Sequence, residues 1–235
     1  MTETTNASPR PAPWGLLWLD LETTGLEPRE DGILEIAYHL TDFEYPYAPK
    51  SVSQYRGHYL VQSPFARAVA DDNLANRVVQ EMHDKSGLAA RIREHYLEER
   101  ADATARAEGI AFRPRYTLTA PTTIEADLLT LSQDWPLEDK DARVVLAGNS
   151  VHFDLGFLRV HFPAFARRLS YRVFDVSSTL MFCRSLGMPA PPKVEPAHRA
   201  MEDVEHSMRT AKACAEWMRV HGPRSPVSDP EREKA

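Results

Sequence analysis

Short apolar runs bounded by turn residues predict three strands in the first part of the chain. The run LLWLDLET, residues 16–23, is followed by a turn at TGLEP and by a longer apolar run over residues 32–43. A third strand is expected at residues 57–62. The turn at Gly25 is short enough to pair the first two strands as antiparallel neighbours.

The rest of the chain predicts helices that alternate with short strands. Helices are expected at residues 72–80, 86–101, 122–135, 154–161, 177–186 (capped by Ser177) and 201–220, and strands at 143–147 and 172–176. In the last helix, apolar residues recur with the helical period. Three strands followed by alternating helices and strands predict an α/β fold. Its mixed central sheet has three antiparallel strands first and is flanked by helices.

The same pattern predicts a single domain over residues 14–220. Within it, the stretch 99–121 has no clear period and is expected to be an irregular insertion. Residues 1–13 and 221–235 are polar and rich in proline, and we expect both tails to be disordered.

Composition narrows the classes of protein that fit. The 235 residues are 43% hydrophobic and 26% charged, as in soluble globular proteins, and the formal net charge is −6. An acidic chain lacks a long basic stripe, so a nucleic-acid substrate should be short or held locally. Cys183 and Cys214 are expected to be reduced buried thiols. No membrane span or targeting segment is evident, which favours the cytoplasm.

Two acids interrupt the first apolar run. Side chains alternate along a strand, so Asp20 and Glu22 share one face with Trp18. Two close carboxylates raise each other's pKa unless a cation lies between them, and hard divalent cations bind such groups. Two interpretations stay open at this point: a metal site, or an Asp20 paired with an arginine next to a Glu22 that has already left the strand.

Two later stretches carry further candidate residues. In GNSVHFDLGF, Asp154 opens an apolar helix, where an ordinary helix cap is the simplest explanation. In PAHRAMEDVEHSM, His198 precedes Asp203 by five residues, and Asp203 lies in the first turn of the last helix. An acid there also complements the helix dipole. Each stretch alone is a weak signal.

The order of these residues is more specific than any one of them. Together they resemble the DEDDh 3′→5′ exonucleases: Asp20 and Glu22 match the first motif, Asp154 the second, and His198 with Asp203 the third. The resemblance covers about residues 16–217 and implies a ribonuclease H-like fold. It also implies that the four acids hold two divalent cations (Mg²⁺ or Mn²⁺), with Asp20 bridging them. His198 would be the general base that takes a proton from the attacking water.

Within that class, three stretches are similar to oligoribonuclease, which degrades very short RNA to mononucleotides: HDKSGL, GNSVHFD and YRVFDVS. The resemblance implies a set of substrate-binding residues: Leu26, His83, Ser86, Ser150, Tyr171, Arg172 and Ser177. Ser150, Arg172 and Ser177 would cap a 5′ phosphate, which suits a helix start. Leu26 would wedge against a base, and Tyr171 would reach into the site of the neighbouring protomer of a homodimer.

The sequence also departs from that family's pattern. Thr23 stands where the family has Met, and Val78 where it has a base-stacking Trp, a contact worth roughly 1–3 kcal/mol. Two substrates therefore stay open. One is short oligoribonucleotides, cleaved to nucleoside 5′-monophosphates; the other is the single-stranded 3′ ends of longer DNA or RNA. An inactive nucleic-acid-binding protein is disfavoured, because all five motif positions carry competent residue types.

Overall fold

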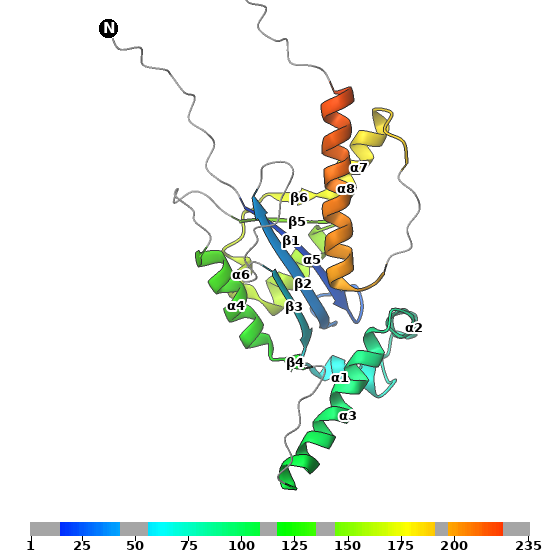
Figure 1. Cartoon of the computed structure of the whole chain (residues 1–235), viewed down its shortest axis with the longest axis vertical. Helices are drawn as coiled ribbons and strands as arrows, with labels where there is room; N and C mark the ends of the chain where they lie inside the picture. The colour runs from blue at the N-terminus through cyan, green and yellow to red at the C-terminus, as the bar shows by residue number, and fades with distance from the viewer. Residues whose placement is uncertain (1–14, 43–55, 109–116, 135–143, 191–196, 223–235) are drawn as a thin grey trace, which may run out of the picture.

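A six-stranded sheet forms the centre of the protein, which we describe from a computed structural model (Figure 1). The structure describes residues 15–42, 56–108, 117–134, 144–190 and 197–222. The strands are β1 (Gly15–Thr23), β2 (Ile33–Asp42), β3 (Arg56–Val61), β4 (Leu118–Thr119), β5 (Val144–Gly148) and β6 (Val173–Asp175). The helices are α1 (Pro64–Ala70), α2 (Arg77–Lys85), α3 (Leu88–Ala107), α4 (Pro121–Asp134), α5 (His152–His161), α6 (Pro163–Ala166), α7 (Val176–Ser185) and α8 (Ala200–His221).

The sheet is mixed, as the sequence predicts. Its order is β4-β3-β2-β1-β5-β6. β1, β2 and β3 pair antiparallel, and β5 and β6 continue the sheet in parallel from β1. β4 pairs parallel with β3 and lies at the other edge. The α/β fold with a mixed sheet flanked by helices is confirmed.

The alternation along β1 sends its side chains to two different cores. Leu17, Leu19 and Leu21 pack on one face in the core that α4, α5 and α6 cover. Leu16 and Trp18 pack on the opposite face against residues of α8. Figure 1 shows α8 crossing the sheet over β1 and β2. Asp20 and Glu22 therefore leave β1 on the side that α8 covers.

A third core joins the helices that follow β3. Leu88 and Ile92 of α3 pack with Ala66 and Val69 of α1 and with Leu34 of β2. In Figure 1, α1, α2 and α3 lie together at one end of the sheet, and α3 projects away from it. Along the described parts of the chain, no helix combines the length and the apolar character that crossing a bilayer needs.

The prediction of a helix over residues 72–80 is wrong in its first half. A turn lies there instead, with Asp72 at a φ of 53°, and α2 begins only after Asn76, whose side chain accepts from the Val79 amide. The polar residue Asn76 starts α2, whereas α1 has already ended at Ala70. The pattern also missed α1, α6 and the two-residue β4, which are too short for a clear period.

Two further expectations need correction. The stretch 99–121 is not irregular throughout, because α3 continues to Ala107, β4 follows at Leu118 and α4 starts at Pro121; residues 109–116 lie outside the described part. The side chain that caps α7 is Asp175, not Ser177, since it accepts from the Ser178 amide. The C-terminal tail predicted at 221–235 begins too early, because α8 includes His221. Residues 1–13 and 223–235 lie outside the described residues, and the single-domain prediction stays a prediction.

Candidate active site

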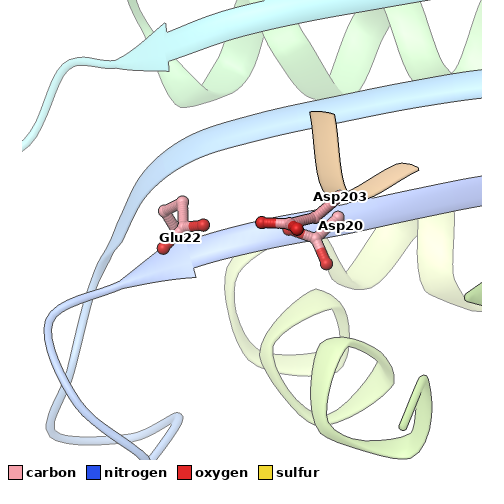
Figure 2. Close-up of side chains that lie close together, drawn as sticks. All are labelled: Asp20, Glu22 and Asp203. Carbon is pink, nitrogen blue, oxygen red and sulfur yellow. The ribbon is translucent and has the colours of Figure 1, made fainter. Parts of the chain in front are cut away.

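Three carboxylates from two distant parts of the chain converge on the α8 side of β1. Ligand oxygens of Asp20, Glu22 and Asp203 all lie within 4.8 Å of one another. Figure 2 shows Asp20 and Asp203 side by side, with Glu22 nearer the end of the strand. This is an all-oxygen donor set of the kind that hard divalent cations prefer.

Local geometry explains how α8 delivers Asp203 to this point. Val204 and Ala211 anchor α8 on the sheet beside Trp18. At the start of the helix, the Arg199 amide donates to Asp203 Oδ2 at 3.2 Å, and the Asp203 amide donates to the Arg199 carbonyl at 3.0 Å. The first bond satisfies the amide of the N-cap residue, the second is the first backbone bond of the helix, and together they hold the carboxylate of Asp203 over the first turn.

Asp154 contacts β1 where this strand extends beyond its pairing with β5. β5 pairs with β1 only as far as Ala147 opposite Trp18, so the amide of Leu21 has no strand partner on that side. Asp154 Oδ1 accepts from that amide at 3.1 Å. The interpretation of Asp154 as a helix cap is therefore wrong. Asp154 lies inside α5, whose N-cap is Val151, and its buried carboxylate accepts a hydrogen bond from β1.

Burial and mutual repulsion raise the pKa values of these acids. Burial, followed by the charges of Asp154, Glu22 and Asp203, raises the pKa of Asp20 well above its usual value. Burial raises the pKa of Glu22 to about 8, with Glu35 and Asp203 adding to it, and burial raises the pKa of Asp154 to about 8. Without cations, these groups cannot all be ionised at neutral pH.

His198 lies in the segment just before α8, at the edge of a hollow. Its backbone has a φ of 50°, an uncommon conformation for a residue other than glycine. The hollow is about 450 Å³ and is lined by Val78, Glu81, Met82, Lys85, Ser86, Ala197 and His198. The structure therefore brings α2 and the segment of His198 together around one space.

His83 belongs to α2, which lines the hollow, and its side chain is fully buried. Its Nε2 is 2.8 Å from the carbonyl oxygen of Thr23, which can only accept, so Nε2 carries the proton. Burial lowers its pKa, which keeps the ring neutral. Nδ1 has no hydrogen-bond partner among the described residues and lies 3.9 Å from Glu22 Oε2. Ser86 Oγ donates to the His83 carbonyl at 3.2 Å.

The remaining predicted substrate residues are at the surface. Ser150 Oγ and Ser177 Oγ are 3.4 Å apart, so two of the three proposed phosphate-capping residues are in contact. The guanidinium of Arg172 lies 4.5 Å from the centre of the Tyr171 ring. Leu26 and Tyr171 are 75% and 80% exposed.

The comparisons with known proteins decide the family. No family model matches the sequence. An oligoribonuclease of Colwellia psychrerythraea is 33% identical over 210 residues, which cover 86% of this chain and 93% of that protein. The chain belongs to the oligoribonuclease family. Membership makes it a hydrolase of the 3′→5′ exonuclease class.

Other relatives of the family agree with this assignment. The oligoribonuclease of Ectopseudomonas mendocina is 30% identical over 208 residues, covering 85% of this chain and 93% of that protein. The mitochondrial oligoribonuclease of Mus musculus is 28% identical over 200 residues, 83% of this chain and 69% of that protein. Because relatives include bacterial and mitochondrial proteins, the cytoplasmic location expected from the sequence stays a prediction.

Solved structures agree on the fold. Exonuclease I of E. coli, in a complex with a dT13 oligonucleotide, matches with a TM-score of 0.52 and 14% identity over 88% of this chain. This chain corresponds to only 42% of the length of that protein. The match confirms the predicted ribonuclease H-like architecture.

Sequence reasoning missed one buried group beside the oligoribonuclease carboxylates. Glu35 of β2 is fully buried and binds the side chains of Arg199 and His58. The signal was present: Glu35 is an acid inside the apolar run ILEIAYHL, as Asp20 is inside LLWLDL. A buried charge requires a partner, and Arg199 directly follows His198.

Raising the pH of the metal-free protein from about 5 to 9 is expected to lower its stability. The folded pKa values of Glu22 and Asp154, both about 8, lie above their ordinary values of 4.5 and 3.8. A group whose pKa is higher in the folded state than in the unfolded state contributes its full stabilisation of the folded state below the unfolded pKa. The stabilisation is then lost as the pH rises through the folded pKa. Melting temperatures in EDTA should fall over this range, by an amount equivalent to a few kcal/mol, about 1.4 kcal/mol per pKa unit.

Saturating Mg²⁺ or Mn²⁺ should remove most of that loss, because a cation binds the ionised acids of the folded state. The exposed Glu30→Gln variant is the control, since it alters net charge without touching the cluster. Equal pH slopes with and without the cation would contradict a metal role for these acids.

Proposed function

We propose that this chain is a divalent-metal-dependent 3′→5′ exoribonuclease that hydrolyses short oligoribonucleotides to nucleoside 5′-monophosphates. Membership in the oligoribonuclease family supports the reaction class. The observation that carries the proposal is the convergence of Asp20, Glu22 and Asp203, with ligand oxygens within 4.8 Å of one another, on the side of β1 that α8 covers.

Asp20, Glu22, Asp154 and Asp203 would hold two Mg²⁺ or Mn²⁺ ions. The donor set fits such ions, because it is made of oxygens and because burial and repulsion make the acids unfavourable without cations. When bound, divalent ions lower the pKa of water and neutralise charge on the phosphate. The protein's own part is to hold these oxygens in place through the β1 backbone and the first turn of α8.

His198 would take the proton from the attacking water. A histidine suits this role near neutral pH, because its ordinary pKa is about 6.5. The hollow that His198 lines with Val78, Met82 and Ser86 offers space for a nucleotide beside it. Val78 is 78% exposed there, so it presents an apolar surface, though not an aromatic one, to a base.

The exposed residues outside the carboxylate cluster favour a short substrate. Ser150 and Ser177, with Arg172, would bind the terminal 5′ phosphate and stop a longer strand from passing; the contact between the two hydroxyls supports this. Leu26 would contact a base from its exposed loop position. The net charge of −6 agrees with a substrate that is held locally rather than along a groove.

A homodimer is part of the proposal. Tyr171, Met181 and Phe182 expose large apolar side chains, at 80%, 72% and 58%. Of these three residues, Phe182 lines a groove of about 850 Å³ between the C-terminal parts of α7 and α8, together with Leu186 and Trp217. Exposed apolar area of this kind marks interaction surfaces, and a second copy would bring its own Tyr171 toward the site.

The function is tested by a product time course with Mn²⁺ on 3′-labelled and 5′-labelled RNA and DNA oligomers of two to twenty nucleotides. We expect mononucleotide release from the 3′ end, no turnover in EDTA, and the highest kcat/KM on RNA of two to five nucleotides. Equal kcat/KM on a dinucleotide and on a twenty-nucleotide single strand would instead support a general 3′→5′ exonuclease of DNA or RNA ends. The absence of mononucleotides with every substrate would contradict the proposal.

A further inference from the structure

Glu35 is a fifth carboxylate next to the carboxylate cluster. It is the direct partner of Glu22 in the antiparallel pairing of β1 and β2, so both side chains leave the sheet on the same face. Its side chain is fully buried. By position alone, Glu35 is a candidate for another metal ligand.

The hydrogen bonds of Glu35 exclude that role. Oε1 lies 2.6 Å from His58 Nε2 and accepts from Arg199 Nη2 at 2.6 Å. Oε2 accepts from Arg199 Nε at 3.2 Å and from the Ala200 amide at 3.1 Å. Both oxygens are occupied by donors. Although burial acts to raise its pKa, the bonds from His58 and Arg199 lower it to about 2, so Glu35 stays ionised.

The bidentate contact ties β2 to the start of α8. Arg199 is the N-cap of α8, and its side chain is only 8% exposed. Two parallel N–H···O bonds from one guanidinium restrict its orientation more than a single bond does. The Ala200 amide on the same carboxylate fixes the first residue of the helix as well.

Arg199 stands between the proposed base and a proposed metal ligand. It directly follows His198, whose φ of 50° is unfavourable for an L-residue and persists only where the surroundings hold it. The amide of Arg199 also donates to Asp203 Oδ2. Fixing Arg199 therefore fixes the backbone that carries both His198 and Asp203.

We propose that Glu35 is a positioning residue for catalysis, which acts through Arg199 to hold His198 and Asp203 in their working places and to keep the arginine away from the carboxylate cluster. This inference rests on the proposed function. Glu35 touches neither substrate nor metal. Without its negative charge, the buried guanidinium of Arg199 would turn to Glu22 or Asp203 and compete with cations there.

The test compares Glu35→Gln with the wild type in two assays: steady-state kinetics on a dinucleotide, and thermal stabilisation by Mn²⁺ without substrate. For Glu35→Gln, we expect kcat to fall ~10–100-fold while KM changes by less than about 3-fold. The Mn²⁺ concentration for half-maximal stabilisation should rise about 10-fold. Wild-type kcat in Glu35→Gln would overturn the proposal.

Two further variants separate positioning from general stability. His58→Ala removes another partner of the same carboxylate but leaves Arg199 bound to it, so kcat should stay within about 3-fold of wild type. The double variant Glu35→Gln/Arg199→Met removes both charges of the buried Glu35–Arg199 pair, so neither is left without its partner. This variant should bind Mn²⁺ like the wild type yet keep the low kcat, and it serves as the test if Glu35→Gln alone does not fold. Recovery of wild-type kcat in the pair variant would overturn the proposal.

A double-mutant cycle with His198→Ala tests the route of the effect. Saturating Mn²⁺ offsets the weaker cation binding of Glu35→Gln, so under that condition the cycle measures the part of the effect that passes through His198. Adding Glu35→Gln to His198→Ala should then lower kcat by less than about 3-fold further. Multiplication of the two losses would overturn the proposal. The proposed function is judged separately by metal-dependent turnover of the wild type, so a failure there is distinct from a failure of the Glu35 series.

Discussion

Replacing Asp20 with Asn is expected to lower kcat on a dinucleotide by ~10³-fold or more. Asp20 lies at the centre of the acids, because Asp154, Glu22 and Asp203 all act on its pKa. An amide keeps the shape of the side chain but loses the charge that a divalent cation requires. The loss corresponds to several kcal/mol of transition-state stabilisation, at about 1.4 kcal/mol for each tenfold change.

The same variant should be more stable than the wild type in EDTA at pH 8. Removal of one buried charge relieves the repulsion on its neighbours, by roughly 1.4–2.7 kcal/mol at one or two pKa units. The measurement pairs initial rates with melting temperatures, with and without Mn²⁺. Glu30→Gln, an exposed acid of the loop after β1, is the matched control. Wild-type turnover in Asp20→Asn would remove Asp20 from the reaction.

Replacing His198 with Ala is expected to lower kcat ~10²–10⁴-fold, which is the usual contribution of general acid–base catalysis. His198 is not in the cluster of Asp20, Glu22 and Asp203, so thermal stabilisation by Mn²⁺ should be unchanged. That combination distinguishes a lost base from a lost metal site.

His95→Ala on α3 is the matched control for this variant, since α3 contributes no residue to the carboxylate cluster or the hollow. Its kcat should stay within about 2-fold of wild type, as for most substitutions away from a site. If His198→Ala retained full turnover, another group would have to accept the proton from water.

The pairing of β1 with β2 and the shared face of Asp20 and Glu22 were predictable because both follow from short-range rules, whereas the set of site acids came from the family resemblance and stays a prediction. A period of two along residues 16–23 places Asp20 and Glu22 on one face, and the short turn makes β1 and β2 neighbours; both are observed. The long apolar period of residues 201–220 gives α8, and Asp203 falls in its first turn as expected.

Local patterns gave the wrong result where the structure depends on single residues or on contacts far along the chain. Asn76 caps α2 and moves its start from the predicted residue 72 to Arg77, and Asp175 caps α7 where Ser177 was expected. Asp154 looked like a helix cap because nothing in the local sequence indicates that the Leu21 amide lies beyond the pairing of β1 with β5. That amide donates to Asp154 instead.

Taken alone, the sequence determined which acidic side chains interrupt its apolar segments, on which faces of their strands and helices they lie, and, by resemblance, the class of reaction. Only the tertiary structure decided that Asp20, Glu22 and Asp203 meet, and that Glu35 does not join them as a ligand. The physical reason is that these outcomes depend on how α8 packs across the sheet. That packing places Arg199 on Glu35, and no periodicity within one segment encodes a contact between residues 164 positions apart.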